Sequence, residues 1–230
     1  MVTNFGTNPN FKCPCKKTIG TCSNIDHPKK MEWLVGPFVE GWSLGKYSRK
    51  KKEDSSENDL HYGHRKYGQL INKYKYQAPN LPVAEMNDLR QAVMNKINSE
   101  VENFILGYFP RYLREFDTVI AVPSKTGKRE TIQNSICEYL GMRGFKNLTG
   151  ILVINEFSNT ATKNIELKLR SQNLDNVFKL IDKDRLKVSR GILLVDDVYE
   201  SGATLKKCVG LIDKEVPLIK KFFLTVAYLD

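Results

Sequence analysis

The chain has 230 residues, of which 41% are hydrophobic, and a formal net charge of +10 at neutral pH. This length suits one main domain, or one core with a small appendage. No apolar run approaches the ~18 residues of a membrane-spanning helix, and the N-terminus lacks the charged-then-apolar order of a secretory signal. We therefore expect a cytoplasmic protein without a membrane partner. The positive surplus suits a polyanionic ligand, but it does not define a fold.

Residues 1–30 hold a dense group of metal-binding residue types. The five cysteines of the chain are odd in number and unevenly spaced, which argues against a disulfide framework. Three of them are followed by a histidine, and this set could close a tetrahedral zinc site: Cys13, Cys15, Cys22 and His27. Their spacing is not the paired Cys-x-x-Cys arrangement. A zinc module and free reduced thiols on a flexible segment both stay open.

Residues 31–60 combine an apolar stretch with a charged one. The apolar residues between Met31 and Tyr47 are too few for a core of their own, so we expect them to pack on the main domain. Residues 48–59 are polar and charged without an apolar partner, which indicates a solvated loop.

Residues 61–76 interleave aromatic and basic side chains. Rings beside cations are typical of single-strand nucleic-acid binding, and the candidates here are Tyr62, Tyr67, Lys73, Tyr74 and Lys75. The same stretch also places four apolar side chains at helical spacing, which predicts a buried helix face with the lysines in water: Tyr67, Leu70, Ile71 and Tyr74. The periodicity favours the buried face.

An alternation of helices and strands follows from Asn87 onward. Asn87 can cap a long helix that ends before Pro110, and residues 117–122 predict a short strand. The strand runs into a loop that contains Ser124 and Lys125, a plausible cradle for pyrophosphate at a strand's carboxyl end. A solvated basic turn is the alternative for that loop. Residues 131–140 predict a helix and residues 150–154 the next strand.

The second half contains a long polar stretch, a central strand and a last strand. Residues 155–176 lack apolar periodicity and predict a mobile lid that carries Arg170. The continuous run Ile192–Val195 predicts a strand buried on both faces, followed by Asp196 and Asp197. Residues 201–204 offer backbone N–H groups and hydroxyls at the start of a helix, which suits a phosphate. Residues 222–229 predict the last strand.

Residues 191–204 resemble the phosphoribosyl-diphosphate (PRPP) signature of type I phosphoribosyltransferases. That signature is a hydrophobic strand, an acidic pair, two variable residues and Thr-Gly-x-Thr. The resemblance implies that Asp196 and Asp197 hold the ribose hydroxyls, and that the 5′-phosphate binds to Glu200, Ser201, Gly202, Ala203 and Thr204. Ser201 replaces the usual Thr and keeps the hydroxyl, whereas Glu200 must point outward to be tolerated near a phosphate. A different doubly wound domain that ends a strand in Asp-Asp is the alternative.

Further motifs resemble the ComF family of competence-associated, phosphoribosyltransferase-like proteins. The resemblance covers about residues 60–230 and includes Lys73-Tyr74-Lys75-Tyr76, Val122-Pro123 and Arg170-x-x-Asn173-Leu174. Many members begin with a cysteine-rich zinc module, as residues 1–30 do in altered form. The family commonly shows Arg-Gly-Phe-Asn-Gln where this chain has Arg129-Glu130-Thr131-Ile132-Gln133. The resemblance therefore bears on the PRPP side of the site more than on the acceptor.

These observations predict an α/β fold like that of type I phosphoribosyltransferases, with a mainly parallel sheet flanked by helices. We expect a cysteine-containing segment over residues 1–30 with Zn²⁺ as its candidate metal, a hood over 31–85 and the phosphoribosyltransferase-like domain over 86–230. The predicted function is Mg²⁺-dependent phosphoribosyl transfer from PRPP to an unknown acceptor, linked to DNA uptake, competence or repair proteins. Ser124, Lys125 and Arg170 would bind the departing pyrophosphate. The alternatives are a non-catalytic adaptor that binds single-stranded DNA and a PRPP-sensing regulator.

Overall fold

A six-stranded sheet forms the centre of the molecule. The computed structural model describes residues 29–31, 39–47, 66–108, 114–124, 130–155 and 177–229. The strands lie in the order β1-β2-β8-β7-β3-β4. Their bounds are β1 (Lys29–Met31), β2 (Val39–Lys46), β8 (Lys220–Tyr228), β7 (Gly191–Tyr199), β3 (Thr118–Ala121) and β4 (Lys146–Asn147). Five strands run parallel and β1 is antiparallel to β2. The structure confirms the expected α/β architecture with a mainly parallel sheet.

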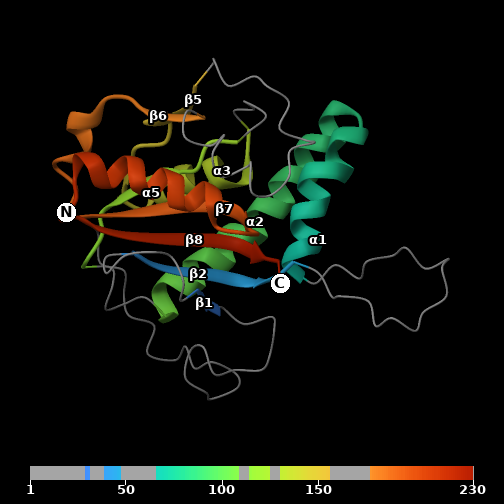
Figure 1. Ribbon diagram of the computed structural model, residues 1–230. Coiled ribbons are helices and arrows are strands. Elements are labelled where there is room, and N and C mark those ends of the chain that lie inside the picture. The colour runs from blue at the N-terminus through green and yellow to red at the C-terminus, as the bar shows by residue number, and fades with distance from the viewer. Residues whose placement is uncertain are drawn as a thin grey trace, which may run out of the picture.

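Helices cover both faces of this sheet, as Figure 1 shows. Helix α2 (Val83–Tyr108) and helix α3 (Ile132–Met142) pack on one face, and helix α5 (Ala203–Glu215) packs on the other. From β3 the chain crosses through α3 to β4, and from β7 it crosses through α5 in the opposite direction to β8. Right-handed crossovers that move in opposite directions place their helices on opposite faces.

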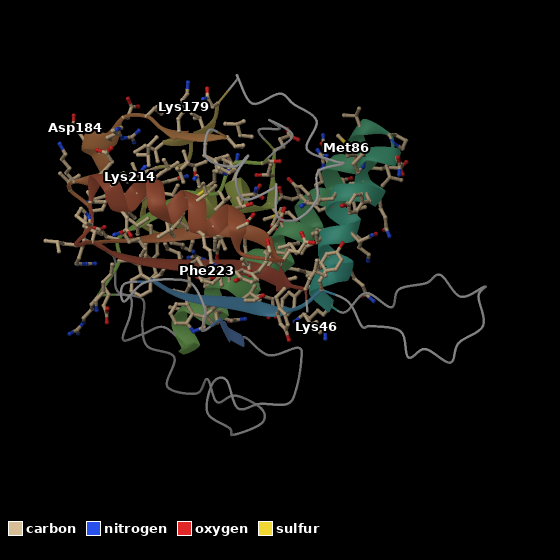
Figure 2. The ribbon with its side chains drawn as sticks, in the orientation of Figure 1. Lys46, Met86, Lys179, Asp184, Lys214 and Phe223 are labelled. Atoms are coloured by element: carbon tan, nitrogen blue, oxygen red, sulfur yellow. The ribbon has the colours of Figure 1, made fainter. Side chains whose placement is uncertain are left out.

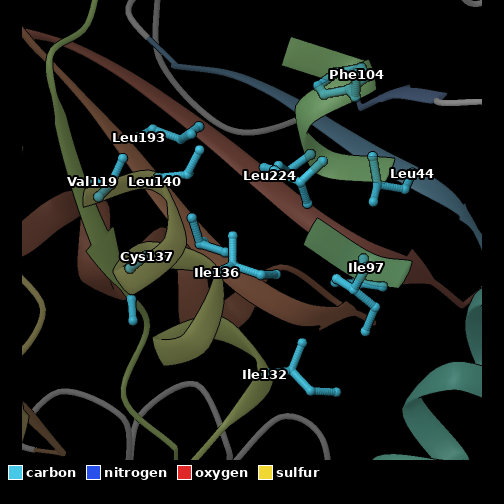
Figure 3. Close-up of a cluster of buried hydrophobic side chains, with 14 of the residues drawn as sticks. Leu44, Ile97, Phe104, Val119, Ile132, Ile136, Cys137, Leu140, Leu193 and Leu224 are labelled. Atoms are coloured by element: carbon cyan, nitrogen blue, oxygen red, sulfur yellow. The ribbon is translucent and has the colours of Figure 1, made fainter. Parts of the chain in front are cut away.

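The larger core lies between the sheet and the α2–α3 layer. Figure 3 shows Ile97 and Phe104 of α2 and Ile136 of α3 directed toward Leu193 and Leu224 of the strands. Helix α1 (Lys66–Asn72) and strand β2 add buried side chains to the same core, among them Trp42, Leu44 and Ile71. The described residues before α2 are therefore part of one hydrophobic core with the residues after it.

Helix α1 continues into two short turns before α2 begins, the first wider and the second tighter than an α-helical turn. They are the π-helical turn η1 (Lys73–Gln77) and the 3₁₀ turn η2 (Ala78–Asn80). Helix α2 then begins at Val83 after Pro82, four residues before the expected cap at Asn87. Residues 83–85 are exposed, so the apolar periodicity that indicated the helix could not locate its first turn.

The predicted strand over residues 150–154 does not join the main sheet. It forms β5 (Leu152–Ile154), which pairs antiparallel with β6 (Phe178–Leu180) in a separate two-stranded sheet near α5. The parallel neighbour of β3 is the two-residue strand β4, whose Lys146 and Asn147 carry no apolar signal. A 3₁₀ turn, η6 (Lys183–Leu186), then leads back toward β7.

Strand β2 approaches β8 closely because it carries a glycine. Gly41 lies opposite Phe223, and a Cβ atom at Gly41 would overlap the Phe223 ring. Figure 2 labels Phe223 within the sheet and Lys46 at the carboxyl end of β2. Among the described helices, none is both long and apolar enough to cross a bilayer.

Candidate functional site

The candidate site lies where strands β3 and β7 run side by side. The backbone N–H of Val122 donates to the carbonyl of Val195 at 2.8 Å, so the loops that follow the two strands start from the same edge of the sheet. The crossovers leave these two strands in opposite directions, and ligands of open α/β sheets bind outside the carboxyl ends at such a point. The loop containing Ser124 and the acidic pair are thereby brought to one edge.

The acidic pair lies within strand β7 and not after it. The ladder between β7 and β8 continues beyond Asp196 to Tyr199, four residues past the predicted end at Val195. Successive residues of a strand point to opposite faces. Leu194 packs in the core cluster of α5, whereas Val195 packs in the cluster of α2 and α3. Asp196 and Asp197 therefore diverge to the two sides of the strand, with the Asp197 N–H donating to Asp196 Oδ1 at 2.9 Å.

Asp197 forms an ion pair with Lys75 of the π-helical turn η1. Its Oδ2 contacts Lys75 Nζ, and the two side chains are 13% and 35% exposed. Asp196 turns toward α5, where burial and then the Asp196 charge raise the pKa of the Cys208 thiol. The two carboxylates thus have different surroundings, a cation on one side and a buried helix on the other.

Two tyrosines lie near the Lys75–Asp197 pair. Burial, followed by the phenol of Tyr76 and the charge of Asp197, raises the pKa of Tyr47, which places the three groups near one another. Tyr47 follows β2 directly and packs partly against the core, while Tyr76 is 60% exposed. An exposed ring and a partly exposed cation therefore border the acidic pair.

The loop after β7 turns at a glycine directly before a helix. Gly202 adopts a left-handed conformation with φ 68° and immediately precedes α5. Glu200 and Ser201 are exposed. No side chain caps the first turn of α5, although Ser201 Oγ accepts a long hydrogen bond of 3.4 Å from Ala203 N–H. Ala203 and Thr204 are half-buried in that turn.

Gly202 also packs against a neighbour that the sequence does not indicate. A Cβ atom at Gly202 would lie 2.5 Å from the Tyr199 hydroxyl and 2.9 Å from its Cζ. Tyr199 is buried and stacks on Phe223 at a centroid distance of 5.7 Å. The glycine is therefore required by the loop itself, whether or not a phosphate approaches it.

The loop after β3 is anchored from beneath by the start of α3. Thr131 caps that helix, its Oγ1 accepting from Asn134 N–H at 3.2 Å. Gln133 is 2% exposed and its Nε2 donates to the Val122 carbonyl at 3.1 Å. Ser124 is half-buried at the described end of this loop, and Lys125 lies outside the described residues.

Among the described candidates for nucleic-acid binding, the tyrosine rings are buried and the lysines are exposed. Tyr67 and Tyr74 are 3% and 6% exposed and belong to the larger core, together with Leu70 and Ile71. This burial agrees with their interpretation as one helix face. Lys73 is exposed, and Lys75 pairs with Asp197 as described above.

Several predicted site residues lie outside the part of the chain that the structure describes. They are Cys13, Cys15, Cys22, His27, Tyr62, Lys125 and Arg170. Within the described ranges, no three His, Cys, Asp or Glu side chains gather as a metal site. The remaining cysteines, Cys137 and Cys208, are buried free thiols.

Sequence comparisons give no family to which the chain can be assigned. No protein-family model matches it, and no curated protein matches its sequence. The geometry of its own residues is therefore the basis for a functional proposal.

Proposed function

We propose that this protein binds PRPP with Mg²⁺ and transfers its phosphoribosyl group to an acceptor. The observation that carries the proposal is the position of the acidic pair, which lies in β7 beside the start of the Ser124 loop and shortly before the Gly202 loop. An anionic ligand with a ribose between two phosphate groups matches that arrangement: a helix N-terminus on one side, carboxylates in the middle and a second loop beyond.

Each part of the ligand has a candidate partner. The uncapped first turn of α5 offers N–H groups and the Thr204 hydroxyl to the 5′-phosphate. Asp197 and Asp196 offer oxygens to the ribose hydroxyls. Ser124 stands at the start of the loop that would receive the diphosphate.

The residues also suit a magnesium ion brought by the ligand. Mg²⁺ is commonly held by one or two carboxylates together with substrate phosphates and water, and it prefers oxygen ligands. Asp197 would supply a protein oxygen, and the ion would neutralise charge on the diphosphate. The absence of a three-residue cluster among the described residues is compatible with this arrangement because the ligand provides the other oxygens.

In the proposed reaction, the main task of the protein is to position the ribose, the diphosphate and the acceptor. The bond between C1 of the ribose and the diphosphate oxygen breaks, and a bond from C1 to the acceptor forms, so diphosphate leaves. Fixed N–H donors and cations that neutralise the leaving group can supply most of the rate, together with orientation of the ribose. The proposed likeness to ComF-type phosphoribosyltransferases is supported by this site and by the motif resemblance.

Calorimetric titration with PRPP, with and without Mg²⁺, tests the proposal. Wild type should bind PRPP only with Mg²⁺ present. Asp197→Asn should weaken binding by about tenfold or more, the effect of losing one charge-assisted hydrogen bond. Ser201→Thr, which restores the residue usual in the signature, should bind as wild type does. A folded wild-type protein without PRPP affinity at millimolar ligand would overturn the proposal.

The two alternatives are separated by different measurements. A PRPP-sensing regulator would bind PRPP and release no diphosphate with any acceptor. A single-strand binder would need stacking rings, and the burial of Tyr67 and Tyr74 removes two of its candidates from the described surface. No observation in the described residues favours either alternative over transfer.

A further inference from the structure

We propose that Lys75 is a binding residue of this site that exchanges partners: it neutralises Asp197 in the free protein and moves to the diphosphate of the ligand when Mg²⁺ occupies the carboxylate. This inference rests on the proposed function, because it names a residue of the same site. It also reassigns Lys75, which the sequence pattern grouped with nucleic-acid binding residues.

The first support is the place from which Lys75 reaches Asp197. The π-helical turn η1 is held on both sides of Lys75 by buried residues, Tyr74 before it and Ala78 after it. Tyr74 is fixed further by Arg90, whose guanidinium lies 5.3 Å from the ring centroid. The Ala78 N–H donates to the Lys73 carbonyl and closes the wide turn. The backbone is thus anchored in the core while the Lys75 side chain extends to the edge of the sheet.

The second support is the difference in exposure between the two partners. Asp197 is mostly enclosed at 13% exposure, whereas Lys75 retains 35% of its side-chain surface. A lysine has four rotatable side-chain bonds and three donors, so its ammonium can turn to a new anion without movement of the anchored backbone. Tyr76, the residue after Lys75, is itself 60% exposed.

The third support is the balance of charge at the edge. In the free protein, the Lys75 ammonium offsets the negative charge of Asp197. A magnesium ion at Asp197 would repel the Lys75 ammonium, while a diphosphate beside it would attract that ammonium. Both effects favour transfer of Lys75 from the carboxylate to the ligand. Lys75 is therefore expected to oppose the binding of metal alone and to favour the binding of metal with diphosphate.

The test compares these two effects in Lys75→Met, which keeps the apolar stem and removes the charge. Calorimetry with Mg²⁺ alone should show tighter binding in Lys75→Met than in wild type. Titration with PRPP in saturating Mg²⁺ should show about tenfold weaker binding, as for the loss of one charge-assisted contact. Lys75→Arg should restore PRPP affinity to within about threefold of wild type because it keeps a cation at the same place.

A matched control is available on the neighbouring helix. Lys66 of α1 forms an ion pair of the same kind with Glu100 of α2, and neither residue belongs to β7 or its loop. Lys66→Met should leave both titrations unchanged. If Lys75→Met shifts the two affinities in the same direction, or shifts neither, the pair is only structural and the inference is overturned.

A third ligand separates failure of this inference from failure of the proposed function. Should wild type not bind PRPP, phosphoribosyl transfer is overturned, and inorganic pyrophosphate with Mg²⁺ then decides the role of Lys75. A tenfold loss of pyrophosphate binding in Lys75→Met supports the exchange of partners. Equal pyrophosphate binding in the variant and wild type, or none in wild type, overturns it.

Discussion

Gly202 has two separate reasons to be glycine, and they can be told apart by experiment. Its φ of 68° is in the left-handed region, and its missing Cβ leaves room for the Tyr199 hydroxyl. A side chain in that backbone region costs about 1–2 kcal/mol. Contact with a phosphate would be a third reason, but it would affect ligand binding and not the stability of the free protein.

We therefore predict that Gly202→Ala lowers the free energy of unfolding even without a ligand, by at least about 1–2 kcal/mol. Adding Tyr199→Phe should recover part of the loss because it removes the oxygen nearest the new methyl group. Urea unfolding followed by circular dichroism gives the free energy of unfolding of Gly202→Ala and of the double variant. Wild type and Tyr199→Phe alone are the references. Unchanged stability in Gly202→Ala would mean that the loop tolerates a side chain and that Gly202 serves the ligand alone.

At the residue scale, the sequence indicated the acidic pair but not its surroundings. The order of strand, carboxylates and glycine loop is local, so residues 191–204 could be recognised in one stretch. The partner of Asp197 comes from Lys75 in a distant part of the chain, and no local pattern links the two. The sequence also does not show that Asp196 and Asp197 point to opposite sides, because this depends on strand β7 continuing to Tyr199.

Among the elements, the junction between α5 and β8 depends on a buried lysine. Lys221 is fully buried; its Nζ contacts Asp213 and donates to the carbonyls of Val216 at 2.9 Å and Pro217 at 3.2 Å. These bonds close the turn between the helix and the strand. The neighbouring Lys220 is exposed and pairs with Glu115 at the surface, so the chain offers its own control.

We predict that Lys221→Met destabilises the protein by at least about 1.5–3 kcal/mol, the loss of one hydrogen bond to a charged group. Lys220→Met should cost less than about 1 kcal/mol because surface ion pairs contribute little. Chemical denaturation of the two variants under identical conditions gives the comparison. Equal losses in both would show that the α5–β8 turn does not depend on the bonds of Lys221.

The elements themselves were predictable where they are apolar and periodic. Helix α3, strand β7 and strand β8 follow from their buried patterns, and the structure has them within a few residues of the predicted bounds. Strand β4 has only two polar residues, so no apolar signal marks it. Strand β5 was found as a strand, but its antiparallel partner β6 lies beyond the polar stretch, and pairing of that kind cannot be read from periodicity.

For the whole molecule, the described segments before residue 86 complete the core and do not merely cover it. Strand β2 forms a long ladder with β8, and Trp42 packs on Phe222 and Phe104 with centroid distances of 6.3 and 6.4 Å. Without the described segments before residue 86, Phe222 and the side of β8 that pairs with β2 would lose their apolar cover.

We predict that a chain consisting of residues 86–230 does not fold stably, whereas the full chain unfolds in one cooperative transition. Removal of β2 and α1 should expose apolar surface, which the dye ANS would detect, and should abolish a sharp thermal transition. Calorimetry and near-ultraviolet circular dichroism of the two chains test this. A truncated chain with a cooperative transition would show that residues 86–230 form a domain of their own.

The ladder between β2 and β8 also sets an order of events during synthesis. Val39 faces Lys221, roughly 180 residues later, so β2 leaves the ribosome about 10 to 40 s before its partner at ordinary translation rates. During that interval the parallel edge of β2 has no strand to bind, and its apolar residues must be sheltered by other means. The protein can complete its sheet only after β8 has been synthesised, and premature termination within β8 would leave β2 without its parallel partner.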